Sequence, residues 1–222
     1  MNSQESDLQS YYRSRASEYD QVYLKPERQA DLRDIEHWLP GKFSGATVLE
    51  IACGTGYWTR FIAQSATHVV AIDTSPETMR IAEGRVPAGK VQFLIADAYD
   101  LPPKLGKFDA AFAGFWFSHV PRPKRRTFLR GLHALLMPGA KIVLLDNRYA
   151  EASSSPIAET DAVGNTYQAR RLKDGSMHRI LKNFPSEAEL HATVAGIGTG
   201  GAMATWQYFW AFEYVATEAR SS

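Results

Sequence analysis

Apolar residues follow two periodicities along this chain, and together they predict strands that alternate with helices. Short apolar runs are typical of buried strands, whereas the segments between them repeat apolar residues at helical spacing. The predicted strands cover about 47–52, 68–73, 91–96, 108–113 and 140–147, and the predicted helices about 57–65, 76–84 and 122–136. This alternation predicts an α/β fold with a doubly wound, mostly parallel sheet that binds ligands at the carboxyl ends of its strands.

The N-terminal segment shows only the helical period. Leu8, Tyr11, Tyr12, Ala16 and Tyr19 recur at helical spacing, which predicts an amphipathic helix laid over the body of the protein. A second helix is expected from about Pro26 to Trp38, where Pro40-Gly41 ends it. These two helices are the expected lid, at about 5–40, of a single domain that spans 1–222.

After the fifth predicted strand, the linker-like stretch 150–156 leads into an insertion at about 150–185. Its residues 167–182 form two alternating runs around Asp174-Gly175, a pair that favours a type I′ hairpin turn. A two-residue turn would place Arg170 opposite Arg179, and like charges in such a pair oppose sheet formation by up to ~1 kcal/mol. We therefore expect compensation by a carboxylate elsewhere in the domain, by solvent, or by an anionic substrate held by the guanidinium groups.

Composition narrows the classes of partner. Among 222 residues, 25 Lys and Arg balance 24 Asp and Glu to a net charge of +1, so we expect neither a nucleic-acid footprint nor a polybasic membrane anchor. Cys53 is the only cysteine, the N-terminus is too polar for a secretory signal, and no apolar run reaches membrane-spanning length. A cytoplasmic protein is expected. His119, His133 and His178 lie on separate predicted elements, so no metal site is expected.

The turn after the first strand carries the clearest chemical signal. Gly54 and Gly56 let the backbone approach a nucleoside closely, and Asp73, which ends the next strand, would accept hydrogen bonds from ribose hydroxyls. A dinucleotide fingerprint requires a third small residue where this chain has Thr59, preceded by the bulky Tyr57-Trp58. The turn therefore departs from a pyrophosphate cradle, which makes a nicotinamide-dependent oxidoreductase the remote alternative.

The same turn resembles motif I of class I S-adenosylmethionine (SAM) methyltransferases, with Glu50, Gly54 and Gly56 in place and Ala52 where the family has its first glycine. The loop at Asp97, the run 108–112 and the run 136–146 also resemble the family's later elements in order. The resemblance implies a Rossmann-like sheet of seven strands with an antiparallel C-terminal strand and a small β-hairpin cap. It further implies that the SAM-binding residues are Tyr11, Tyr19, Glu50, Ala52, Gly54, Gly56, Trp58, Asp73, Thr74, Asp97, Ala98 and Phe115.

A narrower resemblance, over about 10–190, is to the bacterial phosphonate O-methyltransferases of natural-product pathways. It rests on the segments 11–20, 54–60, 115–121, 172–175, 179–182 and 184–190. It implies O-methylation of a small anionic acceptor. The resemblance weakens at the C-terminus, where the segments 196–201 and 206–210 would form the last two strands. The substrate-binding residues expected on this basis are Arg15, Tyr23, Trp116, His119, Arg170 and Arg179.

His119 is the expected catalytic residue, because it follows the fourth predicted strand at the rim of the site. An ionised phosphonate or carboxylate needs no base, whereas an alcohol, phenol or amine usually benefits from one. His119 would act as that base, or as a cationic or hydrogen-bonding group that orients an anion; packing beneath the following helix is the structural alternative. C- or N-methylation in secondary metabolism or quinone biosynthesis, and a SAM-binding protein without catalysis, remain as other hypotheses.

Overall fold

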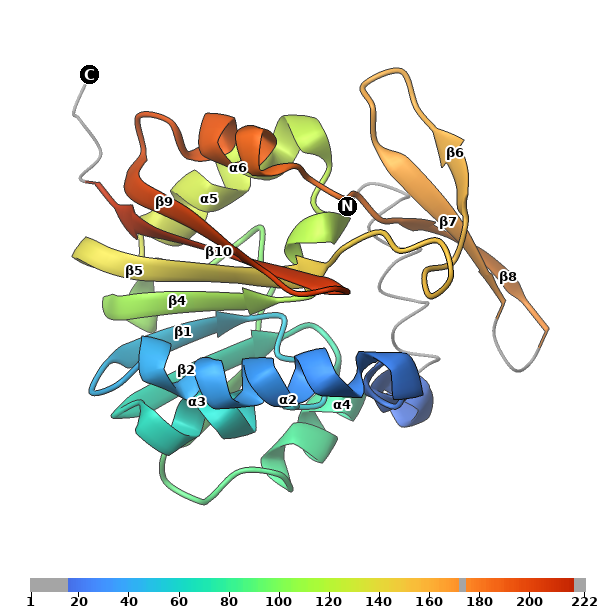
Figure 1. Cartoon of the computed structure of the whole chain (residues 1–222). Helices are drawn as coiled ribbons and strands as arrows, with labels where there is room; N and C mark the ends of the chain where they lie inside the picture. The colour runs from blue at the N-terminus through green and yellow to red at the C-terminus, as the bar shows by residue number, and fades with distance from the viewer. Residues whose placement is uncertain (1–15, 172–174, 218–222) are drawn as a thin grey trace.

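The computed structural model describes residues 16–171 and 175–217, and its centre is a sheet of seven strands in the order β3-β2-β1-β4-β5-β10-β9 (Figure 1). Strand β10 runs antiparallel to both of its neighbours, and the five strands from β3 to β5 are parallel. The expected sheet, mostly parallel with an antiparallel C-terminal strand, is therefore confirmed. The strands are β1 (Thr47–Ile51), β2 (His68–Asp73), β3 (Val91–Ile95), β4 (Phe108–Gly114), β5 (Leu136–Asn147), β9 (Gly198–Thr205) and β10 (Phe209–Ala216).

The order of the strands places a topological switch point between β1 and β4 at the carboxyl edge of the sheet. The chain proceeds from β1 outward through β2 to β3, then returns to place β4 against the other side of β1. The loops that follow β1 and β4 therefore leave the sheet in opposite directions. Ligands of doubly wound sheets bind at such a switch point, so this edge is where the site is expected.

Helices cover both faces of the sheet, and each face has its own apolar core. Figure 1 shows α2, α3 and α4 below the sheet and α5 and α6 above it. Their bounds are α2 (Gln29–Trp38), α3 (Thr59–Ser65), α4 (Pro76–Glu83), α5 (Arg125–His133) and α6 (Glu187–Val194). Within the described ranges, no helix is long and apolar enough to cross a membrane.

The boundaries differ from expectation at several elements; the last two strands, expected at 196–201 and 206–210, are β9 at Gly198–Thr205 and β10 at Phe209–Ala216. Strand β5 begins at Leu136 rather than near 140, because the chain passes through Gly139 at φ +81° and resumes pairing with β4. Helix α5 accordingly ends at His133, and the 3₁₀ helix η6 (Arg122–Lys124) precedes it. The start of the predicted N-terminal helix lies outside the described residues, and the remainder is the 3₁₀ helix η1 (Ala16–Tyr23).

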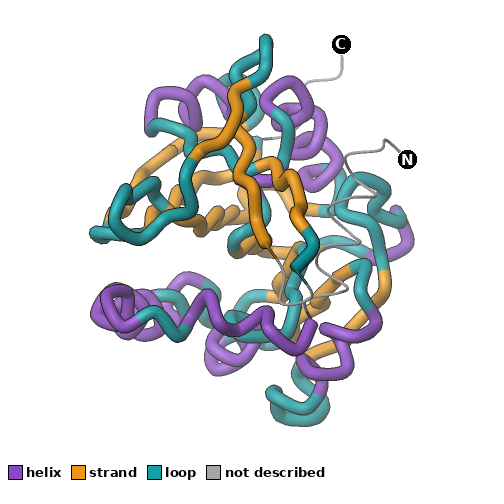
Figure 2. The backbone as a smooth tube through the Cα atoms, turned by 90° about the vertical axis from the view of Figure 1, so that its right-hand side faces the viewer, coloured by secondary structure: helices purple, strands orange, loops and turns teal. Residues whose placement is uncertain are grey.

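The insertion after β5 forms a separate antiparallel sheet, the cap, with strands β6 (Ile157–Thr160), β7 (Thr166–Arg171) and β8 (Met177–Leu181) (Figure 2). The hairpin is confirmed, but β6 was not predicted. Its register differs by one residue, because Arg170 pairs with His178 and Arg179 pairs with Ala169. A one-residue shift moves side chains to the other face of a sheet, so Arg170 and Arg179 lie on opposite faces and their predicted pairing is wrong. Of the expected turn residues, Asp174 lies outside the described residues and Gly175 lies within them.

Gly56 gives a test of how the turn after β1 packs. Its φ is +75°, and a Cβ there would lie 2.8 Å from the Cβ of Ala82 on α4. Gly56→Ala should therefore lower the free energy of unfolding by about 2 kcal/mol or more, through backbone strain and overpacking. Gly41→Ala is the control, since a Cβ there would meet nothing within 4 Å and its φ is not positive. Equal urea denaturation midpoints for the two variants would contradict this account.

Candidate functional site

The loop after β1 is held in a strained, compact shape at the carboxyl edge. Ala52 has φ +54° and Gly54 has φ +56°, both in the left-handed region that favours glycine. Ala52 stands where the resembling family has glycine, so this chain accepts the strain of a Cβ at that position. Gly56 was expected to make room for a ligand, but the space beside it is filled by Ala82 of α4.

Asp73, at the end of β2, organises this loop. One carboxylate oxygen accepts a hydrogen bond from the backbone N–H of Gly54 at 2.8 Å, and the other accepts from the N–H of Ser75 at 2.9 Å. Burial raises the pKa of Asp73, and these backbone hydrogen bonds oppose the rise. A carboxylate at this strand end has the acceptor chemistry that the expected ribose contact requires.

Glu50, on β1, provides the test of whether this edge fits the SAM cofactor. Its side chain is buried, and its Oε2 has no hydrogen-bond partner among the described residues. Burial raises the pKa of Glu50 to about 8. An orphaned carboxyl oxygen in the interior calls for a cationic or donating partner, and the ammonium group of the methionine part of SAM has that chemistry. Glu50 and Asp73 together fit the cofactor.

The loop after β3 supplies the next part of the same edge. Asp97 accepts a hydrogen bond from the backbone N–H of Tyr99 at 2.9 Å, which makes a local turn, and Ala98 is buried between them. Thr74 follows Asp73 directly on the neighbouring strand end. The structure therefore brings the expected residues of β1, β2 and β3 to one edge.

Aromatic rings line the site where η1 meets the strand ends. The rings of Tyr23 and Tyr57 stack at 3.6 Å, and Tyr23 also stacks on Phe115 at 5.6 Å. Trp58 meets the edge of both Tyr23 and Phe115, at 5.8 and 5.9 Å. Phe115 has φ +59°, an unusual conformation for a bulky residue, directly after β4.

Trp116 turns away from this cluster and packs near Tyr99, with ring centroids 5.8 Å apart; its Nε1 has no hydrogen-bond partner in the described part of the chain. Tyr11 and Arg15 lie outside the described residues. Tyr19 belongs to η1, but its side chain is not described.

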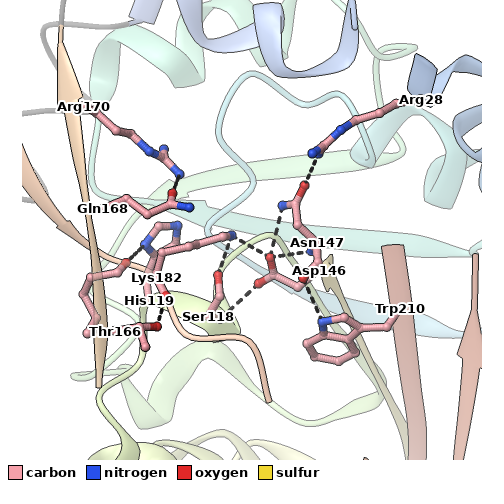
Figure 3. A network of polar contacts seen from close by, with 11 residues as sticks. Arg28, Ser118, His119, Asp146, Asn147, Thr166, Gln168, Arg170, Lys182 and Trp210 are labelled. Carbon is pink, nitrogen blue, oxygen red and sulfur yellow. Dashed lines mark hydrogen bonds and ion pairs between the residues drawn. The ribbon is translucent and has the colours of Figure 1, made fainter. Parts of the chain in front are cut away.

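Beside the cofactor edge, a buried polar network joins the cap to the main sheet (Figure 3). The Lys182 ammonium, just after β8, donates to Oδ1 of Asp146 at 2.7 Å and to Oγ of Ser118 at 2.6 Å. Ser118 in turn donates its backbone N–H to Oδ2 of Asp146 at 3.0 Å. Burial alone would raise the pKa of Asp146, but the charge of Lys182, with hydrogen bonds from Lys182 and Ser118, holds it below its usual range. Burial lowers the pKa of Lys182.

His119, at the end of the 3₁₀ helix η5 (Phe117–His119), lies within this network and is 4% exposed. Its Nδ1 is 2.6 Å from the carbonyl oxygen of Leu181 on β8, which makes Nδ1–H the donor and Nε2 the basic nitrogen. Burial, with Lys182 adding to it, lowers the pKa of His119 well below its ordinary value. A neutral imidazole suits a base or a hydrogen-bonding group, and the cationic role is therefore disfavoured.

Basic side chains approach this network from both the cap and the N-terminal segment. Arg170 of β7 donates to Gln168 at 2.9 Å and lowers the pKa of Lys25 and of Lys182, so it lies within electrostatic reach of both. Arg28 is buried and donates to Oδ1 of Asn147 at 2.7 Å. Figure 3 shows Arg170 and Arg28 extending toward the Asp146 pair from two different elements.

Arg179 does not join them. Its guanidinium donates twice to the Glu159 carboxylate, both at 2.8 Å, and lies over the Tyr167 ring at 3.4 Å from the centroid. Glu159 on the unpredicted strand β6 is the compensating carboxylate that was one of the expected possibilities.

Ser118, Asp146 and Lys182 were not among the predicted site residues. Asp146 ends an apolar strand, as Asp73 does, and that position was the available signal. Nothing local marks Lys182 as its partner, because 36 positions separate the two residues.

Comparison with known proteins places this geometry in a family. A model described as "Methyltransferase domain" matches residues 48–139. In the solved DhpI–SAH complex, the protein is 30% identical with a TM-score of 0.79 over 96% of this chain and 97% of DhpI. The DhpI–SAM–HEP complex gives 29% identity and a TM-score of 0.78 over 96% and 98%.

A curated relative, the ubiquinone biosynthesis O-methyltransferase of Xanthomonas oryzae pv. oryzae (strain PXO99A), is 33% identical over 153 residues. That match covers 67% of this chain and 60% of the relative, so the chain spans about three fifths of that relative's length.

The buried carboxyl of Glu50 predicts an unusual pH dependence of stability. A carboxyl whose folded pKa is raised to about 8 destabilises the fold progressively as the pH rises from its unfolded value toward 8. Without cofactor, Glu50→Gln should remove this dependence and gain about 1–3 kcal/mol relative to wild type between pH 5 and pH 8. Urea denaturation at both pH values measures it. If wild type and Glu50→Gln lost the same stability between pH 5 and pH 8, the result would contradict a buried carboxyl at Glu50 with a raised pKa.

Proposed function

This chain belongs to the class I SAM-dependent methyltransferases, and we propose that it methylates an oxygen of a small anionic molecule. Bound SAM supplies an electrophilic methyl group on a sulfonium sulfur. Glu50 and Asp73 would hold its ammonium and ribose ends, with Asp97 toward the adenine and Phe115 beside the methyl group. Because the displacement needs little covalent work from the protein, orientation and exclusion of water carry most of the rate.

The observation that carries the choice of acceptor is the excess of basic groups around the Asp146 pair. Lys25, Arg28, Arg170 and Lys182 lie within electrostatic reach of one another; the carboxylates that act on them are Asp146, which contacts Lys182 directly, and Glu27 and Asp31, which raise the pKa of Arg28. Guanidinium groups bind phosphonate, phosphate and carboxylate oxygens in a fork geometry. An anionic acceptor would offset this positive charge, and we assign its principal contact to Arg170.

The solved neighbours support the proposal, because a protein 29% identical over nearly the whole chain forms a complex with SAM and HEP. We further propose that the rings of Tyr23 and Trp116 close over the acceptor. The proposal also includes the single-domain organisation, in which η1 and α2 form a lid and the three-stranded sheet forms a cap.

A phenolic acceptor of the quinone-biosynthesis kind is the second candidate. It is favoured by the 33% identical ubiquinone biosynthesis O-methyltransferase and by the neutral state of His119, because a phenol must lose its proton to become a good nucleophile. A screen with labelled SAM against small phosphonates, carboxylates and catechols separates the two candidates. Methylation of catechols alone would overturn the anionic reading.

Asp73→Ala tests the cofactor assignment. The substitution removes a charge-assisted acceptor for the ribose, a loss of about 1.5–3 kcal/mol, and should weaken SAM binding roughly 10- to 100-fold. Isothermal titration calorimetry measures it. Asp109→Ala is the control, because its carboxylate bonds to Thr47 at the opposite edge of the sheet. The assignment is wrong if both variants bind SAM as wild type does, or if a nicotinamide dinucleotide binds more tightly than SAM.

Arg170→Gln tests the charge of the acceptor. It should raise the KM of an anionic acceptor by about 10- to 100-fold, the equivalent of one lost charged contact, while the affinity for SAM stays unchanged. Arg179→Gln, in the same hairpin, is the matched control and should leave both constants unchanged, because Arg179 is occupied by Glu159 on the other face. Steady-state kinetics measure the acceptor KM of both variants. Equal values of KM in Arg170→Gln and Arg179→Gln would refute the assignment.

A further inference from the structure

The end of strand β8 holds the short segment that carries His119 through several hydrogen bonds at once. The Leu181 carbonyl accepts from His119 Nδ1 at 2.6 Å, Lys182 donates to the Ser118 hydroxyl at 2.6 Å, and the Asn183 N–H donates to the Ser118 carbonyl at 2.8 Å. The carbonyl that fixes the imidazole belongs to the backbone. Its position therefore depends on what anchors the strand end.

Asp146 is that anchor, because its two carboxylate oxygens hold the two segments together. Oδ2 accepts from the backbone N–H of Ser118, the residue before His119, and Oδ1 accepts from Lys182, the residue after Leu181. All of these groups are buried. Figure 3 shows the Lys182 side chain crossing between the His119 ring and Asp146.

We propose that Asp146 and Lys182 form a positioning pair for His119: they fix η5 and the end of β8, so that the Leu181 carbonyl keeps the proton on Nδ1 and leaves Nε2 as the basic nitrogen. This inference rests on the proposed function, in which His119 assists the acceptor. It gives the cap a part in the chemistry, because the cap strand sets the tautomer of a residue in the 3₁₀ helix that follows β4.

The pair also acts on the charge of the imidazole in two opposing directions. Among the described residues, the charged groups that act on His119 are Lys182 from the end of β8, Arg170 from β7 and Asp146 from β5. Burial and the two cations lower the His119 pKa, whereas Asp146 raises it. Removing one partner should therefore shift the titration of His119 in a direction opposite to that caused by removing the other.

The experiment follows His119 by histidine ¹³C and ¹⁵N NMR in the full chain, with His119→Gln used to assign its signals. Lys182→Met should move the titration midpoint of His119 to higher pH, and Asp146→Asn should move it lower or keep the ring neutral throughout. Both variants should raise the population of the Nε2–H tautomer, because the Leu181 carbonyl is no longer held. With an acceptor that must lose a proton, kcat should fall about 10²-fold or more in each.

Controls separate positioning from simple loss of stability. Lys42→Met and Glu213→Gln break an ion pair of equal length, 2.7 Å, that lies outside this network, and they should not move the His119 titration. If either single variant at the Asp146 pair fails to fold, the double variant Asp146→Asn/Lys182→Met removes both charges and still reports the tautomer.

Two outcomes would overturn the proposal. The first is that the titration midpoint and the tautomer population of His119 in the Asp146 and Lys182 variants are the same as in wild type. The other is a rise in acceptor KM for Lys182→Met with no change in the His119 signals, which would make Lys182 an acceptor contact. The affinity for SAM is measured for wild type and for each variant, which keeps this test independent of the cofactor assignment. If wild type methylated none of the acceptors, that result would count against the proposed function instead.

Discussion

The arrangement of the site depends on one constraint: an ammonium and a carboxylate are buried together at the end of a parallel strand. Removing such charges from water costs several kcal/mol each, and only good geometry with further hydrogen bonds repays that cost. Asp146 meets this requirement with bonds to Lys182 and to the backbone of Ser118. The cap is therefore attached to the main sheet at a point where any displacement would leave a charge buried and unpaired.

This attachment connects two halves of the proposed chemistry that come from different parts of the chain. The cofactor edge is built from the ends of β1, β2 and β3, whereas the acceptor side is built from β5, η5 and the cap. Asp73 holds the loop of the first half by accepting from Gly54, and Asp146 holds the second half by accepting from Ser118. In both places an aspartate near the end of a strand accepts hydrogen bonds from backbone N–H groups, which stabilises a loop at the carboxyl edge of the sheet.

The parts of the fold that follow from local sequence were predictable. The apolar runs predicted five strands in sequence, and the glycine turn with Asp73 predicted the cofactor edge, because these signals lie within short segments. The register of the cap hairpin was not predictable in the same way. In the structure Arg171 pairs with Met177, whereas a two-residue turn on Asp174-Gly175 would pair it with His178. This shift of one position places Arg179 on the face that meets Glu159.

The acceptor side was less predictable, because its residues are brought together by tertiary structure alone. His119 could be selected from its position after a strand, but its neutral state depends on burial and on Lys182, which lies more than 60 positions away along the chain. Composition gave a net charge of +1 and no sign of a basic site. The structure shows why: a few cations lie close together near Asp146, while Arg179, on the opposite face of the hairpin from Arg170, is paired with Glu159. A nearly neutral protein can thereby hold several cations close together, so that local placement of charge, rather than net charge, carries the argument for an anionic acceptor.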